Sequence, residues 1–241
     1  MITRHHISLA IGSIVILYFP LISTSPAFLA AIAAGVCIGV VIPDIQMKKP
    51  RHFKALSFAW LLIQVFKGSI LRFYLFLYRN VLEMHPQADD KRLTHSLPGL
   101  LFLAGMTGCS MLFITWEFPF NSPLYFLRIF LAGIIIGLIL HFLEDICTKK
   151  GLYLFYPFDE TCRISGSIRP CNRNDSRIRL FHIQLAVVII AISLAYYTGF
   201  CPGYLRWPLS VSAVGICTLL MLYYAEVRIN LDGSLESLNK T

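Results

Sequence analysis

The chain has 241 residues, of which 56% are hydrophobic and only 14% are charged. A soluble domain carries about 25% charged residues, so this composition argues against a soluble enzyme and favours a membrane protein with one main domain. The formal net charge is +8. Basic charge is also typical of nucleic-acid binding, but no recognised DNA-binding motif accompanies it, and we do not expect nucleic acid to be a partner.

Long apolar runs separated by short polar connections predict an all-α polytopic membrane bundle of about six transmembrane helices. In chain order the helices are expected at residues 6–22, 27–42, 96–118, 123–147, 180–199 and 205–228. The expected organisation is a membrane-embedded domain at 1–180, a C-terminal transmembrane hairpin at 181–229 and a polar tail at 230–241.

The segment 53–82 differs from these helices because its apolar sequence is interrupted by Lys54, Gln64, Lys67 and two arginines. Such a pattern is typical of an amphipathic helix in the membrane interface, whose cations reach the headgroups while its apolar side chains enter the lipid. We expect this segment to lie in the interface or to re-enter the membrane. Two complete crossings remain an alternative.

The basic residues are distributed unevenly between the two sides of the predicted bundle. The alternate connections, roughly 20–26, 117–123 and 199–207, contribute only Arg206. The other connections carry Lys48, Lys49, Arg51, Lys54, Lys91, Arg92, Lys149, Lys150, Arg163, Arg169, Arg173, Arg177 and Arg179. This asymmetry predicts that the basic connections face the cytoplasm, where anionic lipids also attract them. The protein would lie in the inner membrane if it is bacterial.

His141 and Asp145 interrupt the end of an apolar helix, after the stretch 123–140 in which Arg128 is the only charge. A spacing of four residues places both side chains on one helix face. An ionisable pair at the end of a membrane helix is costly and therefore indicates a functional site. Histidine and aspartate together suit zinc, although a buried His–Asp hydrogen bond is an alternative. Glu144 lies about 100° around the helix and is not expected to be a direct ligand.

Three further helix ends carry candidate ligands. His6 begins the first helix, Asp44 ends the second, and His95 precedes the helix at 96–118. If the segment 53–82 does not cross the membrane once, the antiparallel order of the helices brings all three to the same side as His141 and Asp145. The five side chains then lie on the side of the basic connections and predict a metal site.

Each of these positions also has a simpler interpretation. Asp44 follows Pro43 and is a residue type that commonly stabilises a turn. Thr94 or Ser96 is a suitable cap for the next helix, and His5 competes with His6 as a ligand.

The order of the motifs resembles the YdjM-type family of membrane-bound metal-dependent hydrolases over about residues 1–180. The matching elements are His6, Pro43-Asp44-Ile45, Thr94-His95-Ser96-Leu97 and His141-x-x-x-Asp145-x-x-Thr148-x-x-Gly151, followed by Tyr156-Pro157-Phe158. The resemblance implies a divalent metal, zinc by preference, held by His6, Asp44, His95, His141 and Asp145. The family is similar in motif order to the zinc phospholipase C and single-strand nuclease superfamily, which implies a phosphoester substrate, such as a phospholipid or another lipid-linked ester.

The chain departs from the family pattern at two places. Gln46 stands where the family has the second acid of Pro-Asp-x-Asp, and Asp90-Lys91 stand where it has His-Arg. We predict catalytic roles for Asp90, Lys91 and Arg92. Lys91, Arg92 or the arginines of the loop after residue 150 would pair with a phosphate, and Asp90 would orient His95.

These departures keep a non-catalytic alternative open, namely a membrane interaction or scaffold protein with the same fold. A small transporter is a further alternative. Transporters typically show repeated halves and charged residues near the middle of the bilayer, and neither is evident in this sequence.

Overall fold

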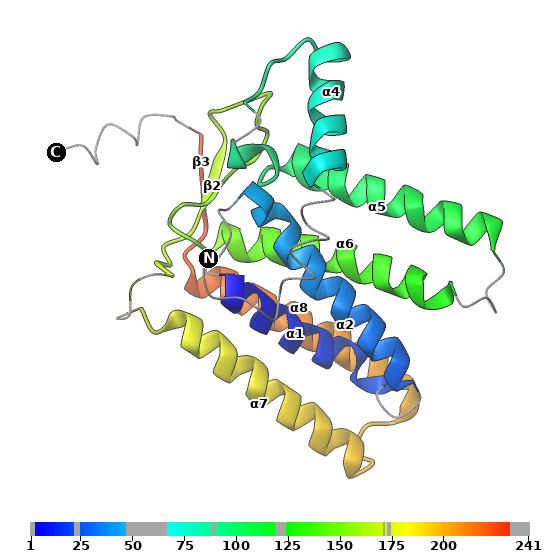
Figure 1. The fold of residues 1–241 in the computed structure, drawn as a ribbon. Coiled ribbons are helices and arrows are strands. Elements are labelled where there is room, and N and C mark those ends of the chain that lie inside the picture. The colour runs from blue at the N-terminus through cyan, green and yellow to red at the C-terminus, as the bar shows by residue number, and fades with distance from the viewer. Residues whose placement is uncertain are drawn as a thin grey trace.

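A computed structural model describes residues 3–21, 25–46, 67–87, 90–118, 124–170, 172 and 175–231, most of which are α-helical (Figure 1). The main helices are α1 (Thr3–Tyr18), α2 (Pro26–Val41), α5 (Leu97–Glu117), α6 (Tyr125–Ile146), α7 (Arg177–Tyr197) and α8 (Arg206–Tyr224). Short helical turns are η1 (Phe19–Leu21), η2 (Ile42–Gln46), η3 (Lys67–Leu71), η4 (Lys91–Leu93) and η5 (Gly203–Leu205). The predicted all-α membrane architecture is confirmed.

Within the described residues, five helices are long and apolar enough to cross a membrane. They span Pro26–Asp44, Leu97–Glu117, Tyr125–Ile146, Arg177–Tyr197 and Gly203–Tyr224. The first helix, α1, is also apolar but has only 16 residues. It packs against α2, α6, α7 and α8 and is therefore part of the same bundle.

Helices α2 and α6 make a backbone-to-backbone contact through two glycine pairs, Gly35 with Gly39 and Gly133 with Gly137. A Cβ atom on Gly39 would collide with the carbonyl oxygen of Ile134, and one on Gly137 would collide with that of Val36. Small residues four positions apart allow membrane helices to approach closely. This contact fixes the position of the α2 end relative to the α6 end.

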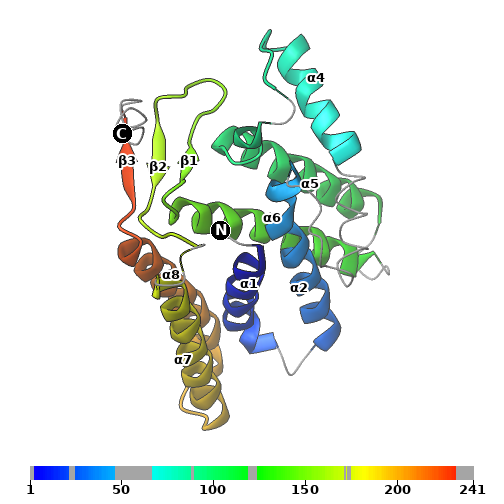
Figure 2. The same ribbon diagram turned by 60° about the vertical axis from the view of Figure 1, so that its left-hand side comes forward.

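The C-terminal hairpin of α7 and α8 packs beside α1 (Figure 2). Leu9 and Ile16 of α1 share one apolar cluster with Phe181 and Leu185 of α7 and with Cys217 of α8. The division of the chain at residue 180 stays a prediction. The shared cluster nevertheless makes the hairpin a packing partner of the N-terminal helix.

A small antiparallel sheet covers the end of the bundle where α6 and α8 finish (Figure 2). Its strands are β1 (Leu152–Tyr153), β2 (Arg163–Ser165) and β3 (Arg228–Asn230). The central residue Ile164 pairs with Leu152 on one side and with Ile229 on the other. The sequence did not predict this sheet, and the expected extension of the last helix to residue 228 is wrong because α8 ends at Tyr224.

Helix α4 (Arg72–Asn80) follows the π-helical turn Lys67–Leu71 and lies crosswise to α5 near the start of that helix (Figure 1). Its buried Tyr74 packs on Phe102 of α5, with ring centroids 4.3 Å apart, whereas Phe76 is exposed. With nine residues, α4 is too short to span a membrane. The described part of the segment, residues 67–82, therefore agrees with the expected short amphipathic helix. Positions 53–66 of the segment lie outside the described residues.

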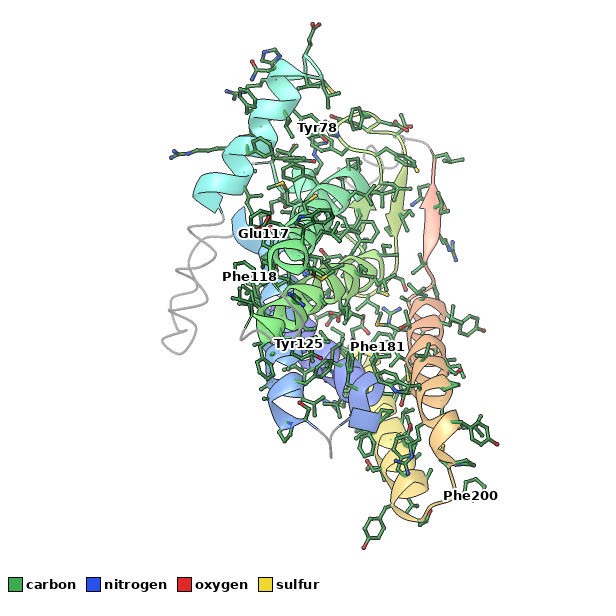
Figure 3. All side chains as sticks on the ribbon, turned by 90° about the vertical axis from the view of Figure 1, so that its right-hand side faces the viewer. Tyr78, Glu117, Phe118, Tyr125, Phe181 and Phe200 are labelled. Atoms are coloured by element: carbon green, nitrogen blue, oxygen red, sulfur yellow. The ribbon has the colours of Figure 1, made fainter. Side chains whose placement is uncertain are left out.

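The opposite end of the bundle carries exposed aromatic side chains. Trp116 and Phe118 lie at the end of α5, while Tyr197 and Phe200 lie at the tip of the α7–α8 hairpin. Figure 3 looks at this end of α5 and α6 and labels Phe118 and Phe200. Aromatic residues concentrate at membrane–water interfaces. We call this the aromatic end and the other the sheet end, although Tyr223 and Tyr224 at the end of α8 are also exposed.

Candidate metal centre

The last turns of α6 present His141 and Asp145 to the interior of the bundle. Their exposed fractions are 2% and 8%. As the four-residue spacing predicts, the side chains lie on one face, and His141 Nε2 is 3.3 Å from Asp145 Oδ2. The glycine contact between α6 and α2 holds this face next to the segment that follows α2.

Asp44 and His95 approach this pair from two other segments. Asp44 lies in η2 directly after α2, and His95 lies just before α5. His95 Nε2 is 3.4 Å from Asp44 Oδ1 and 3.5 Å from Asp145 Oδ2. The hydroxyl of Thr94 donates to the Pro43 carbonyl oxygen over 2.9 Å and ties the two segments together. Ser96 has the predicted capping role, because its hydroxyl accepts from the amide of Gly99.

His6 reaches the cluster from α1. Its Nε2 atom is 3.3 Å from Asp145 Oδ1, and its ring stacks on that of His141 with centroids 4.3 Å apart. His5 turns elsewhere and contacts the ring of His182. The structure therefore brings His6, rather than His5, to the other candidates.

All five predicted ligands thus come together. The possible ligand atoms of His6, Asp44 and His141 lie within 4.8 Å of one another, and so do those of His95, His141 and Asp145. In a tetrahedral zinc site, with bonds of about 2.0–2.1 Å, neighbouring ligand atoms are about 3.4 Å apart. The distances of 3.3–3.5 Å among the imidazole nitrogens and carboxylate oxygens match that spacing.

Hydrogen bonds on the far side of two rings determine which nitrogen faces the cluster. The Nδ1 atom of His95 lies 3.0 Å from the Lys91 carbonyl oxygen, which can only accept a hydrogen bond. In the neutral ring the proton is therefore on Nδ1, and Nε2 offers its lone pair to the cluster. His6 is arranged in the same way, because its Nδ1 atom contacts the carboxylate of Glu144. Metal-binding histidines typically have such partners.

Sequence reasoning missed the role of Glu144. Its side chain is buried, with 3% exposed, and Glu144 Oε2 lies 2.6 Å from His6 Nδ1. As expected, Glu144 does not belong to either group of possible ligands. The sequence shows Glu144 as a second carboxylate beside Asp145 at the end of an apolar helix, but its partner His6 lies 138 positions away in the chain.

The three predicted catalytic residues form a different arrangement. The carboxylate of Asp90 accepts from the Arg92 guanidinium at 2.8–3.1 Å and from the Tyr156 hydroxyl at 2.8 Å. Arg92 also pairs with Glu160 and stacks over the Tyr156 ring. Asp90 was expected to orient His95, but the partner of His95 Nδ1 is the Lys91 carbonyl oxygen instead. Direct catalytic roles for these residues stay predictions.

The pKa values of this group follow from its contacts. Burial alone would raise the pKa of Asp90, but hydrogen bonds from the side chain and amide of Arg92 and from Tyr156 lower it below its usual value. Burial and the hydrogen bond to Asp90 raise the pKa of Tyr156 to about 12. Asp90 is consequently held as a carboxylate and Tyr156 as a neutral phenol.

A family model described as YdjM inner membrane protein matches residues 1–230. The chain belongs to this family. The resemblance inferred from the motifs is confirmed, and the match extends through the C-terminal hairpin. The family's description and the five apolar helices agree on a membrane protein of the YdjM type. No curated protein and no solved structure matched the chain.

Proposed function

We propose that this YdjM-family protein is a membrane-bound metal-dependent hydrolase that cleaves phosphoesters. The observation that carries the proposal is the convergence of His95 Nε2 on oxygen atoms of Asp44 and Asp145. When the His95 ring is neutral and carries its proton on Nδ1, all three groups are hydrogen-bond acceptors and repel one another. A divalent cation between them would accept a lone pair from each of the three groups and compensate the buried negative charge.

The residues that would hold the ion are His6, Asp44, His95, His141 and Asp145. When bound, a divalent ion such as zinc would supply the acidity that makes water a nucleophile near neutral pH. His6 and His95 have their Nε2 lone pairs oriented in advance by Glu144 and by the Lys91 carbonyl. Pre-orientation of this kind lowers the cost of binding.

Cationic side chains near the same end of the bundle favour a phosphate-containing substrate. Because Arg92 already pairs with Asp90 and Glu160, Lys91 is the better candidate for contact with a phosphate. Lys149 and Lys150 follow directly after α6, so their charges also lie at this end. The position of the cluster at the ends of membrane helices suits a phospholipid or another lipid-linked ester.

We further propose that this end faces the cytoplasm. The support is the distribution of basic residues: the site end carries the cations of the loop after α6, whereas Arg206 lies at the aromatic end. Positive residues are retained on the cytoplasmic side of inner membrane proteins.

The test is hydrolysis by the purified, metal-loaded protein, assayed in detergent and in lipid vesicles. The panel contains phosphomonoesters, phosphodiesters and phospholipids, and the variant is Asp145→Asn. The matched control is Asp159→Asn, whose carboxylate accepts from the amide and hydroxyl of Thr161. We expect turnover of at least one class by the wild type and the control, and its loss in Asp145→Asn. Metal-loaded wild type that is inert on the whole panel would contradict the hydrolase proposal.

One observation favours a second candidate function, a non-catalytic membrane scaffold. Gln46 cannot supply the charge of the acid that the family usually has at this position. Retention of metal without turnover of any phosphoester would support the scaffold.

A further inference from the structure

Glu144 is a buried carboxylate that the proposed hydrolase chemistry does not use. It lies on α6 between Leu143 and Asp145, with only 3% of its surface exposed. Its Oε2 atom is 2.6 Å from Nδ1 of His6, whose exposed fraction is 1%. Burial of a carboxylate is costly without such a partner. The contact therefore connects α6 to α1 at the edge of the metal cluster.

The geometry separates Glu144 from the ligands. Glu144 contacts the Nδ1 side of the His6 ring, whereas the Nε2 side lies 3.3 Å from Asp145 Oδ1. The imidazole thus stands between the two carboxylates. When the neutral His6 ring donates a hydrogen bond from Nδ1–H to the Glu144 carboxylate, its Nε2 atom carries the free lone pair.

A small cavity lies on the other side of Glu144. It has a volume of about 30 Å³, and its polar lining includes Ser13 of α1, Gln184 of α7 and Thr218 of α8. Most of the lining is apolar, but a space of this size has room for about two water molecules beside these polar groups. Water in this space would solvate the Glu144 carboxylate from the side away from the metal cluster, because none of the five candidate ligands lines the cavity. The α7–α8 hairpin lines one side of this cavity and so contributes to the environment of Glu144.

We propose that Glu144 is a positioning residue for His6. It fixes the orientation and the tautomer of the ring so that Nε2 points at the metal cluster, and it thereby strengthens metal binding. This inference rests on the proposed metal site and adds a residue that does not itself bind the ion. Removal of such a partner typically weakens metal binding 10- to 100-fold.

The experiment is a Co²⁺ titration of the metal-free, full-length protein in detergent, followed by visible absorption. Glu144→Leu removes the acceptor while keeping similar bulk, and we expect affinity to fall about 10- to 100-fold. Glu144→Gln keeps an acceptor but loses the charge, so its affinity for Co²⁺ should lie between those of Glu144→Leu and the wild type. The matched control is Thr107→Val, a buried residue of α5 whose hydroxyl donates to the Leu103 carbonyl. It should bind Co²⁺ as the wild type does.

A double-mutant cycle distinguishes positioning from a general structural role. In a His6→Ala background, Glu144→Gln should cause no further loss of affinity, because the ring that Glu144 orients is gone. This cycle also applies if Glu144→Leu does not fold. A further loss in the His6→Ala background would contradict the proposal, and so would wild-type affinity in Glu144→Leu.

The outcome for the wild type separates this inference from the proposed function. A wild-type protein that takes up no Co²⁺ would overturn both. A wild-type protein that binds Co²⁺ while Glu144→Leu binds it equally well would overturn only the role of Glu144.

Discussion

His95 and His141 face each other through their Nε2 atoms, which are 3.3 Å apart although the residues lie 46 positions apart in the chain. His95 precedes α5, and His141 belongs to the last turns of α6. Because the Nδ1 atom of His95 donates to the Lys91 carbonyl, its Nε2 atom is an acceptor in the neutral ring. Asp44 and Asp145 add carboxylate oxygens to the same space. This concentration of lone pairs is the basis of the metal-site account.

The neighbouring residues His5 and His6 provide an internal test of that account. His6→Ala should weaken binding of a divalent metal, because it removes the Nε2 atom that lies 3.3 Å from Asp145. His5→Ala should leave metal affinity unchanged, because the His5 ring contacts His182 instead. Metal titration of both variants measures the difference. Equal losses in the two variants would show that the site is assigned to the wrong histidine.

The glycine contact between α2 and α6 should be essential for stability. Gly137→Ala places a methyl group against the Val36 carbonyl, so we expect it to reduce the free energy of unfolding by about 1–3 kcal/mol. Gly105→Ala is the matched control, because a Cβ atom there meets nothing within 4 Å. Denaturant unfolding in detergent compares them. A Gly137→Ala variant as stable as Gly105→Ala would contradict the close packing.

The lowered pKa of Asp90 predicts acid sensitivity. Because the pKa is lower in the folded than in the unfolded chain, the carboxylate stabilises the fold above its ordinary pKa of 3.8, and this stabilisation is lost as the pH falls below that value. The thermal unfolding midpoint should therefore decrease as the pH is lowered from about 5 to about 2. Asp90→Asn should show a smaller fall, whereas exposed Glu83→Gln should behave as the wild type. Identical pH profiles for Asp90→Asn and wild type would contradict this role.

The proposed orientation predicts the location of two reporters. A fluorescent protein fused to the C-terminus should fold in the cytoplasm, because β3 lies at the same end as the metal cluster. A phosphatase that is active only outside the cytoplasm should be active when inserted after Gly199, at the tip of the hairpin. Fluorescence and phosphatase activity measure the two positions. The opposite pattern would place the metal cluster outside the cytoplasm.

Local patterns in the sequence predicted much of the candidate site. The four-residue spacing of His141 and Asp145 is a property of a single helix, so it did not require knowledge of the fold. His6, Asp44 and His95 followed from the antiparallel order of apolar helices, which assigns each helix end to one side of the membrane. The choice between His5 and His6 required the rotation of α1 against α6, which no local pattern specifies.

The features that the sequence did not predict depend on contacts between distant segments. The strands β1 to β3 have only two or three residues each, too few for an alternating pattern to be recognised. Glu144 was set aside because its position on α6 differs from that of His141, and its role depends on α1. The pairing of Asp90 with Tyr156 joins residues 66 positions apart. The side chain of Gln46 lies outside the described part of the chain, so this position enters the argument by its residue type alone.

The central claim is that the His–Asp cluster binds a divalent metal, and the most direct measurement is the metal content of purified protein. Wild type, His141→Ala and Asp145→Ala would be analysed side by side for zinc, manganese and iron. We expect metal bound to the wild type and its loss in both variants, because His141 and Asp145 contribute neighbouring ligand atoms. Unchanged metal content in the two variants would contradict it.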